Sequence, residues 1–346
     1  MTTATGFNAI VGQEQPITLL KAFIRHGTLP HALLFSGDDG VGKQTTATAF
    51  AMACNCERLA IARLQDPCHD AIVACGECIP CRKIAANHHP DIIYITPHAS
   101  VIRIDRIREL LQTLALKPNE ARQRVVILRD AHAMNAEAGN ALLKVLEEPP
   151  RRTLLILTTH QPTDLLPTVV SRCRHIRFLP LAPAQIEGLL RADGDIDPQA
   201  AGTAAALCGG SVTRARALLD ERWQRRRQWL IRTLDHLCTE SGGQLRAWLA
   251  LSEKLSKKKE LIAESLEIVK MWLRDGLVAG CAPEQVLNRD YRDRLTAMAE
   301  REPPSRLLAQ IDAVERAASA LKFNTNTRLT LDAMVLQMAG ATGRYA

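Results

Sequence analysis

The sequence predicts an α/β domain with a parallel five-stranded sheet and a phosphate-binding loop, followed by an all-α region. A glycine-rich loop stands between an apolar run and a helix-favouring run, and five apolar runs alternate with helical stretches. After about residue 180 the pattern becomes wholly helical. Near-continuous apolar strands indicate a sheet that helices cover on both faces. We expect an α/β domain at 1–180, a small helical lid domain at 181–222 and a helical domain at 223–346.

The composition bounds the domain count and the class of protein. A chain of 346 residues with 47% hydrophobic residues builds two or three domains with sizeable cores. Its net charge of +7 suits work near nucleic acid, although an ordinary basic surface is the alternative. We find no signal peptide and no apolar run of membrane length, so we expect a cytoplasmic protein with no membrane partner. Ten cysteines in such a protein favour metal ligands over disulfides.

The phosphate-binding loop is predicted from a strand, a glycine-rich turn and a helix in succession. The apolar run 32–35 precedes the loop, and the helix-favouring run 45–52 follows it. Glycines let backbone N–H groups turn towards phosphate oxygens, and the helix N-terminus adds partial positive charge. Lys43 stands where the loop lysine reaches the terminal phosphates. The loop glycines are Gly37, Gly40 and Gly42.

The magnesium-binding part of this site departs from the motif at two positions. Gln44 replaces the Ser or Thr that holds magnesium, and Thr45 would leave the helix about 100° further round. The apolar run 125–128 should be followed by the acidic residue that organises the ion. Arg129 stands there instead, and Asp130 takes the second acidic position. Because the positive charge of Arg129 would repel magnesium, we expect ATP hydrolysis to be compromised. The alternative interpretation, in which Arg129 and Asp130 are simply a solvated strand end, leads to the same expectation.

A cysteine-rich insertion follows the loop helix, from about residue 54 to residue 90. Two C-x2-C steps share a cysteine and a further cysteine lies upstream, so the insertion offers four thiolates to a tetrahedral zinc ion. Because four thiolates close the coordination sphere, we expect a structural metal. The predicted ligands are Cys68, Cys75, Cys78 and Cys81. Five nearby residues could also serve as ligands but are interpreted as packing or surface residues: Cys54, Cys56, His69, His88 and His89.

The remaining apolar runs and helical patterns complete the α/β domain. Residues 7–30 form a helical lead-in with a turn at Val11 and Gly12. Asp105 is expected to cap a helix that stops at Pro118. A second helix is expected at 136–147, and the other strands at 92–95, 154–157 and 175–178.

The C-terminal part is predicted to be a helical domain with two apolar stripes. Basic clusters at 223–227 and 257–259 are compatible with nucleic-acid binding, but solvated helix faces are the favoured interpretation. The first stripe contains Ile262, Leu266, Val269, Leu273 and Leu277, and the second contains Leu307, Leu308, Ile311 and Val314.

Two motifs in the first domain resemble one family. Residues 140–150 read NALLKVLEEPP, and the tripeptide 171–173 reads Ser-Arg-Cys. Together with the cysteine insertion after the loop helix, they resemble the bacterial sliding-clamp loader family of AAA+ proteins, over roughly residues 7–216. The resemblance implies an AAA+ P-loop domain with a zinc-binding insertion and a small helical lid. It also implies that the C-terminal domain is a collar through which loader subunits oligomerise.

The resemblance implies roles for single residues as well. Arg172 matches the arginine finger that this family supplies to the ATP site of the adjacent subunit. A guanidinium there neutralises charge on a transferring phosphoryl group, although a surface salt bridge is the alternative for Arg172 taken alone. Thr159, beside Thr158, matches the polar sensor of the family. Val11 and Gly12 are the implied contacts to the adenine.

Residues 209–214 resemble the start of the helix that carries the family's second sensor. An alignment on Gly210 and Ser211 places Thr213, and not Arg214, at the sensor position. The role of Arg214 therefore stays open.

We interpret the chain as a clamp-loader subunit that holds geometry and lends Arg172 to a neighbour, with weak ATP or ADP binding and no turnover. It would belong to a DNA polymerase holoenzyme, a nucleotidyltransferase complex, without polymerase activity of its own. The implied partners are motor subunits and the delta subunit in a hetero-pentameric ring, and, through that ring, the sliding clamp and primed DNA. Two alternatives remain: an ATP-hydrolysing motor subunit of the same loader, and a zinc-dependent DNA-binding module.

Overall fold

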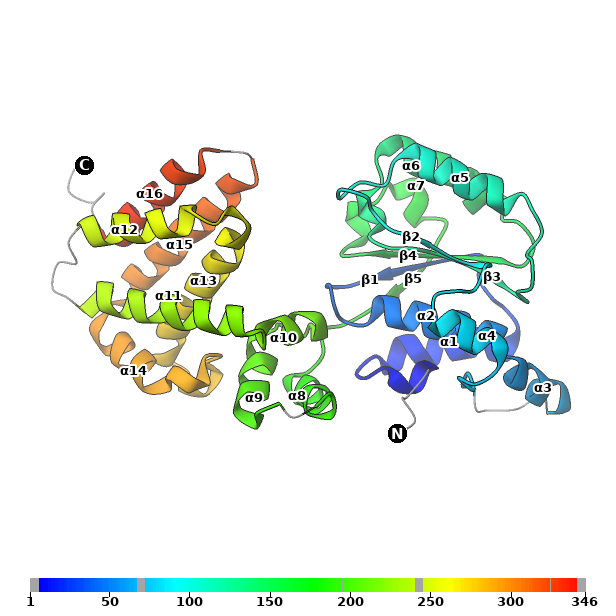
Figure 1. Ribbon diagram of the computed structural model, residues 1–346, viewed down its shortest axis with the longest axis horizontal. Helices are drawn as coiled ribbons and strands as arrows, with labels where there is room; N and C mark the ends of the chain where they lie inside the picture. The colour runs from blue at the N-terminus through cyan, green and yellow to red at the C-terminus, as the bar shows by residue number, and fades with distance from the viewer. Residues whose placement is uncertain (1–5, 67–71, 195, 240–244, 324, 341–346) are drawn as a thin grey trace. The chain divides into compact units, whose positions relative to one another are not determined.

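The computed structural model describes residues 6–66, 72–194, 196–239, 245–323 and 325–340 of the chain (Figure 1). The chain forms two compact units. The first comprises Met1–Leu189 and Gly209–Arg214, and the second comprises Leu190–Cys208 and Ala215–Ala346. Segments of the predicted lid, 181–222, thus occur in both units, and its boundaries stay a prediction. Among the described residues, no helix is long and apolar enough to cross a membrane.

The first unit is built on the predicted five-stranded sheet. Its strands are β1 (Ala32–Ser36), β2 (Ile92–Ile95), β3 (Arg124–Leu128), β4 (Thr153–Thr159) and β5 (Arg174–Arg177). Their order is β2-β3-β4-β1-β5, and all neighbouring strands are parallel. The three inner strands are buried at every residue, whereas the edge strand β5 buries only Ile176. This difference is the one expected for a sheet covered on both faces.

Helices cover both faces of the sheet. They are α1 (Glu14–His26), α2 (Lys43–Asn55), α3 (Glu57–Gln65), α4 (Ile79–Ala85), α5 (Ile104–Leu114), α6 (Ala136–Glu147) and α7 (Pro167–Val170), with short 3-10 turns η1 (Gly6–Ala9), η2 (Ala131–Ala133) and η3 (Pro162–Asp164). Figure 1 shows α5, α6 and α7 over one face and α1, α2 and α4 over the other. Under the first group, Ile107 of α5 and Leu142 of α6 join one core cluster with Val126 and Leu155 of the sheet.

One local prediction for this unit is wrong. The N-cap of α5 is Arg103, and Asp105 lies inside the first turn, where its carboxylate is 3.5 Å from the guanidinium of Arg108. A carboxylate in the first turn still stabilises the helix because it faces the positive end of the helix dipole. The helix ends at Leu114, before Pro118.

The second unit is built from helices. Wholly within it are α9 (Pro198–Leu207), α11 (Glu221–Thr239), α12 (Leu245–Ser256), α13 (Ile262–Ala279), α14 (Arg292–Arg301), α15 (Pro304–Leu321) and α16 (Thr327–Met338), with the turns η4 (Lys259–Leu261), η5 (Pro283–Gln285) and η6 (Arg289–Tyr291). Two more helices, α8 (Pro183–Ala192) and α10 (Val212–Leu218), each have residues in both units.

Helix α13 lies against α11, α14 and α15, and its predicted stripe is confirmed except at its end, where Leu277 is only half-buried. The stripe predicted on α15 is wrong at Leu308, which is 54% exposed. The buried face of α15 instead follows Leu307, Gln310 and Val314. Consecutive helical residues point about 100° apart, so Leu308 lies at the edge of the face that buries Leu307 and is left exposed.

One arginine of the basic cluster 223–227 is structural. Arg227 is 3% exposed, and its guanidinium donates hydrogen bonds to Asn288 Oδ1 and to both carboxylate oxygens of Asp290, at 2.6–3.0 Å. It also lies 5.9 Å from the ring centroid of Trp223 and 5.0 Å from that of Tyr291. Because four of its five N–H donors are occupied and two aromatic rings lie close to the guanidinium, Arg227 holds α11 to the η6 turn.

Candidate functional site

The phosphate loop has the geometry that its glycines predict. Gly37, Gly40 and Gly42 have φ angles of 143°, 75° and 100°, a region that side chains with a Cβ rarely adopt. A Cβ on Gly37 would lie 2.5 Å from the carbonyl oxygen of Phe178, and one on Gly40 would lie 2.3 Å from Ser211 Oγ. Gly37 and Gly40 are therefore required by close neighbours as well as by backbone conformation, whereas Gly42 is required by backbone conformation alone.

The loop lysine is satisfied by the loop itself. Lys43 is 6% exposed, and its Nζ donates to the carbonyl oxygen of Gly37 at 2.5 Å and to that of Asp38 at 2.8 Å. The carboxylate of Asp39 lies 3.6 Å from the same ammonium. Burial lowers the pKa of Lys43, and the carboxylates of Asp39, Asp130 and Asp38 oppose that shift. The positive charge that should meet a phosphate is thus compensated within the chain.

Asp39 has a second partner that the sequence did not reveal. Its Oδ2 lies 3.2 Å from Nε2 of His160, which follows β4 directly. The backbone carbonyl of His160 accepts a hydrogen bond from the N–H of Gly37 at 2.9 Å, so β4 fixes the start of the loop. The ring of His132 lies 5.2 Å from that of His160. The Asp39 carboxylate therefore lies between the loop lysine and a histidine.

The predicted magnesium positions lie near this loop. Gln44 is half-buried and Thr45 is exposed, whereas Thr46 donates its hydroxyl to the Gly42 carbonyl at 2.8 Å. Asp130 has a left-handed φ of 50°, and its backbone N–H donates to Thr158 Oγ1 at 3.0 Å. Neither Thr45 nor Thr46 repeats the Ser or Thr that the motif requires directly after the lysine.

The predicted base and sensor residues lie around the loop. Val11 and Gly12 are half-buried in the turn before α1. The next residue, Gln13, donates to the carbonyls of Val41 and Leu179, at 3.1 and 2.7 Å, and so ties this turn to the loop.

Thr159, the predicted sensor, is buried and donates to the carbonyl of Gln161 at 3.1 Å. Thr213 approaches Gly40 closely, with its Cβ 2.9 Å from the place of a Gly40 Cβ, and the neighbouring Val212 N–H donates to the Gly40 carbonyl. Thr213 therefore faces the loop from the segment that resembles the start of the second-sensor helix.

Arg172 lies at the surface beside α6 and α7. Its side chain is 35% exposed, its Nη2 is 2.6 Å from Glu147 Oε1, and its Nη1 donates to the Thr168 carbonyl at 3.0 Å. Burial raises the pKa of the neighbouring Cys173 thiol to about 12. The guanidinium is thus held in one direction while part of it stays open to solvent.

Four cysteine sulfurs converge next to α2. The Sγ atoms of Cys56, Cys75, Cys78 and Cys81 all lie within 4.8 Å of one another. The backbone N–H of Cys75 donates to Cys56 Sγ at 3.4 Å, and the N–H of Cys78 donates to Cys75 Sγ at 3.3 Å. Four thiolates around a zinc ion at about 2.3 Å need sulfur separations of this order. The donor set fits a structural zinc ion.

The electrostatics of this cluster differ among its members. Burial acts against the Cys75 thiolate, but hydrogen bonds from the N–H groups of Cys78 and Glu77 outweigh it and lower the pKa of Cys75 to about 7. Burial raises the pKa values of Cys56 and Cys81, with nearby sulfurs adding to it. Crowded thiols resist losing further protons unless a cation compensates the charge.

The predicted ligand Cys68 lies outside the described residues, so its role stays a prediction. Among the described residues, Cys56, interpreted from the sequence as a packing or surface residue, meets Cys75, Cys78 and Cys81. Cys56 is the N-cap of α3 and is separated from Cys75 by that whole helix. The position of Cys56 directly after the loop helix was the one sequence signal for its role as a ligand. It was missed because spacing arguments favour ligands that are close to one another in sequence.

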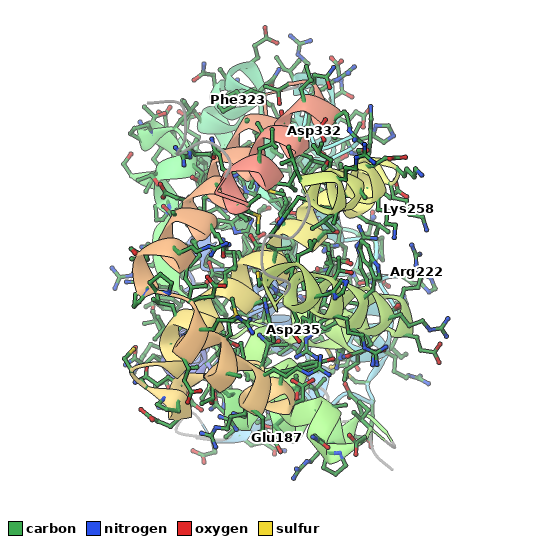
Figure 2. All side chains as sticks on the ribbon, turned by 90° about the vertical axis from the view of Figure 1, so that its left-hand side faces the viewer. Glu187, Arg222, Asp235, Lys258, Phe323 and Asp332 are labelled. Atoms are coloured by element: carbon green, nitrogen blue, oxygen red, sulfur yellow. The ribbon has the colours of Figure 1, made fainter. Side chains whose placement is uncertain are left out.

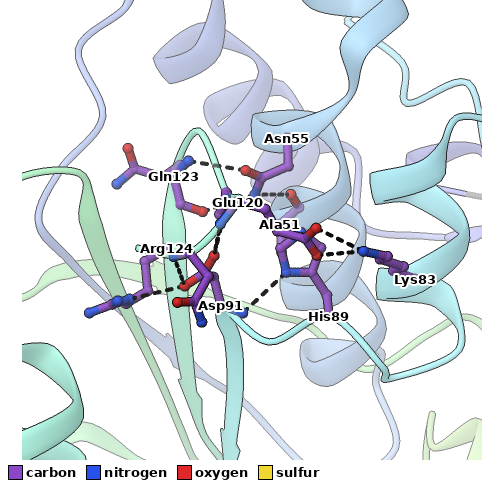
Figure 3. Close-up of polar contacts among 10 residues, drawn as sticks. Ala51, Asn55, Lys83, His89, Asp91, Glu120, Gln123 and Arg124 are labelled. Carbon is purple, nitrogen blue, oxygen red and sulfur yellow. Dashed lines mark hydrogen bonds and ion pairs between the residues drawn. The ribbon is translucent and has the colours of Figure 1, made fainter. Parts of the chain in front are cut away.

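A buried carboxylate beside the cysteine region joins the start of β2 to the segment before β3 (Figure 3). Asp91 is 1% exposed and accepts hydrogen bonds from the backbone N–H groups of Asn119, Glu120 and Ala121, at 2.8–2.9 Å. Arg124 Nε lies 3.5 Å from the same carboxylate. Burial would raise the pKa of Asp91, but these donors and the charge of Arg124 hold it below its usual value.

Two further contacts continue this attachment. Lys83 of α4 is 2.7 Å from Glu120, and Asn55, at the end of α2, bonds to both the carbonyl and the N–H of Gln123. The helix that bears Cys81 and the helix that starts from the phosphate loop are therefore fixed to the same segment before β3 (Figure 3).

Comparison with known proteins supplies the family. The profile described as "DNA polymerase III, delta subunit" matches residues 12–182, and "DNA polymerase III, delta subunit, C terminal" matches residues 220–339. The chain is 32% identical to DNA polymerase III subunit delta' of Pseudomonas aeruginosa, over 90% of this chain and 93% of that protein. It is 27% identical to subunit delta' of Bacillus subtilis, over 94% and 96%.

The chain is also similar to a longer protein. It is 27% identical to DNA polymerase III subunit tau of Bacillus subtilis, over 98% of this chain but only 62% of tau. The delta' relatives are matched over nearly their whole length, and the parallel sheet and the helical second unit fit the predicted AAA+ fold class. The chain belongs to the family of DNA polymerase III delta' subunits.

Proposed function

We propose that this chain is a stator of a clamp loader. It holds the geometry of a complex that opens the sliding clamp and places it on primed DNA, and it does not turn over ATP. The observation that supports this role is the state of Lys43, whose ammonium is hydrogen-bonded to two loop carbonyls and paired with Asp39. Gln44 and Arg129, at the two predicted magnesium positions, also support a chain that does not hydrolyse ATP. Weak ATP or ADP binding by the loop amides remains part of the proposal.

The proposed partners follow from the relatives. Relatives of this chain include DNA polymerase III subunits delta' and tau, so the chain would join motor subunits and a delta subunit in a hetero-pentameric ring. Its helical second unit would serve as the collar. Contact with the clamp and primed DNA would arise through that ring, in the cytoplasm.

Arg172 is the residue that would act on a neighbour. Its guanidinium is held by Glu147 and the Thr168 carbonyl yet remains 35% exposed, which suits a side chain that must reach another subunit in a fixed orientation. We assign it the role of an arginine finger supplied in trans. A zinc ion bound by the four converging cysteines would keep the neighbouring insertion folded.

The second candidate is a motor subunit of the same loader, which the similarity to tau favours. ATP turnover by the purified chain separates the two. We expect no magnesium-dependent hydrolysis above background, and Lys43→Ala should change nothing. Hydrolysis that Lys43→Ala abolishes would establish a motor subunit. Reconstitution of the loader with and without the chain then tests the stator role through assembly and clamp loading.

A further inference from the structure

The second unit has a basic pocket that the proposed function does not use. A cavity of about 460 Å³ opens where the start of α11 meets the connection from α12 to α13. Its walls include Arg222 and Arg226 of α11, and Lys258 and Glu264 from the other side. Figure 2 shows Arg222 and Lys258 on the same side of this unit. The fold thus brings together the two basic clusters, 223–227 and 257–259, which are far apart in the sequence.

Three cations of this pocket have no carboxylate within ion-pair distance among the described residues. Arg222 and Lys258 are exposed, and Arg226 is half-buried. Arg225, by contrast, is paired with Glu221. The pocket therefore holds uncompensated positive charge close to its walls.

Arg226 is oriented for an external anion. Its Nε donates to Ser265 Oγ at 2.6 Å, and its Nη2 lies at the long distance of 3.5 Å from the Leu261 carbonyl oxygen. One edge of the guanidinium is thus fixed, while Nη1 has no hydrogen-bond partner among the described residues. Burial lowers the pKa of Arg226, and the carboxylates of Glu264 and Glu260 oppose that shift from beyond ion-pair distance. A phosphate oxygen at Nη1 would restore the solvation that burial removes.

The acidic groups of the pocket leave a net positive charge. Of its lining residues four are cations and two are acids, but Arg225 is paired with Glu221, which leaves Arg222, Arg226 and Lys258 against Asp220 and Glu264. Asp220 accepts the backbone N–H of Arg222 at 2.7 Å, so its charge faces the start of α11. That helix has 19 residues, and its N-terminus contributes partial positive charge to the same place.

We propose that this pocket binds the phosphate backbone of DNA. Arg226 would contact one phosphate, and Arg222 and Lys258 would contact the phosphates on either side. Cations from two separate elements suit a ligand with regularly repeated charge, which a polynucleotide has. The choice of DNA rests on the proposed role in clamp loading. The chain would then guide the template or primer with its second unit.

The test measures binding of labelled single-stranded and primed oligonucleotides to the isolated full chain, by fluorescence anisotropy over a series of salt concentrations. The variant is Arg222→Gln/Arg226→Gln/Lys258→Gln. Its matched control, Arg232→Gln/Arg246→Gln/Lys322→Gln, removes the same charge from exposed positions of the same unit outside the pocket lining. Because the pocket variant cannot neutralise three phosphates, we expect affinity to fall roughly tenfold or more and the single-strand salt slope to become shallower by about 2. The control should keep most of the affinity and of the slope.

Several outcomes overturn the proposal. The first is that the wild-type chain shows no saturable binding at low salt, and the second is that pocket and control variants bind alike. Competition then identifies the ligand: displacement by inorganic pyrophosphate at equal charge indicates a free-phosphate site, and equal displacement by polyglutamate indicates an acidic protein partner. Arg226→Lys, which keeps the charge but removes the guanidinium, should give an intermediate loss without disturbing the fold. The DNA-binding test uses neither loader assembly nor ATPase activity as a readout. A failure of this proposal is therefore distinguishable from a failure of the proposed stator role.

Discussion

The phosphate loop and the cysteine cluster of the first unit differ in what they require from outside the chain. In the loop, Lys43 is satisfied by two carbonyls and Asp39, and Asp39 is also paired with His160. In the cluster, four sulfurs lie within 4.8 Å of one another, and deprotonation would crowd like charges. A site whose groups satisfy each other gains little from a ligand, whereas a site of crowded anions needs a cation to form. The first unit thus combines a phosphate loop whose lysine is compensated within the chain with a cysteine cluster that fits a metal ion.

The largest effect is expected at the cysteine cluster. Cys78→Ala should abolish zinc binding, because it removes one of the four converging sulfurs. The effect should be large, because structural zinc sites contribute about 10–16 kcal/mol of binding free energy in small zinc-binding peptides. Hydrogen exchange should show reduced protection across α3 and α4 while the sheet stays protected. Metal analysis and exchange on the same sample measure both effects.

The identity of the fourth ligand sharpens this prediction. Cys56→Ala should remove the metal, because its Sγ meets the other three, whereas Cys68→Ala should retain it. The exposed Cys281→Ala is the matched control. Zinc retained by Cys56→Ala and lost by Cys68→Ala would restore the ligand set predicted from the sequence.

An intermediate effect is expected at Asp91, which joins the start of β2 to the segment before β3. Its folded pKa is lowered, so its stabilisation is fully present above the unfolded value of about 3.9 and is lost as the pH falls through the lower folded pKa. Asp91→Asn should cost about 1–3 kcal/mol of unfolding free energy at neutral pH, because three N–H donors lose their carboxylate.

Urea unfolding at several pH values measures this effect. The difference between wild type and Asp91→Asn should shrink in acid, while the exposed Asp105→Asn should change stability little at any pH. A difference that stays constant down to acid pH would show that Asp91 does not act through its charge.

The smallest effect is expected at the phosphate loop. Asp39→Asn removes the carboxylate beside Lys43 and His160, so pyrophosphate and ADP should bind several-fold more tightly than to wild type. Asp38→Asn removes the same charge from the adjacent position but keeps the carbonyl that accepts from Lys43, and should have a smaller effect. Calorimetry measures both. Equal gains would mean that general loop charge, and not the Asp39 position, weakens phosphate binding.

The sheet and the loop were predictable because their signals are local. Apolar runs at 92–95 and 125–128 became β2 and β3, and the glycine loop lies between β1 and α2 as expected. Burial of residues from one stripe, such as Ile262 and Leu266, also follows from helical period.

The contacts on which our proposals rest were not predictable in this way. His160 meets Asp39 because β4 pairs with β1, and Cys56 meets Cys75 across a whole helix. Such pairs depend on how elements cross, which no local spacing records. Arg226 and Lys258 likewise share a pocket only because α11 lies beside the start of α13.

The most direct test of the stator role compares Lys43→Ala and Arg172→Ala in the reconstituted loader. Fingers supplied in trans are worth roughly 10³ to 10⁵ in rate in other systems, and we expect less here because a loader with several motor sites would place only one beside this chain. The exposed Arg151→Ala serves as control. Clamp- and DNA-stimulated ATPase is measured beside assembly by gel filtration. The account predicts normal assembly throughout, reduced ATPase with Arg172→Ala and unchanged ATPase with Lys43→Ala. Reduced ATPase with Lys43→Ala and an unchanged rate with Arg172→Ala would contradict it.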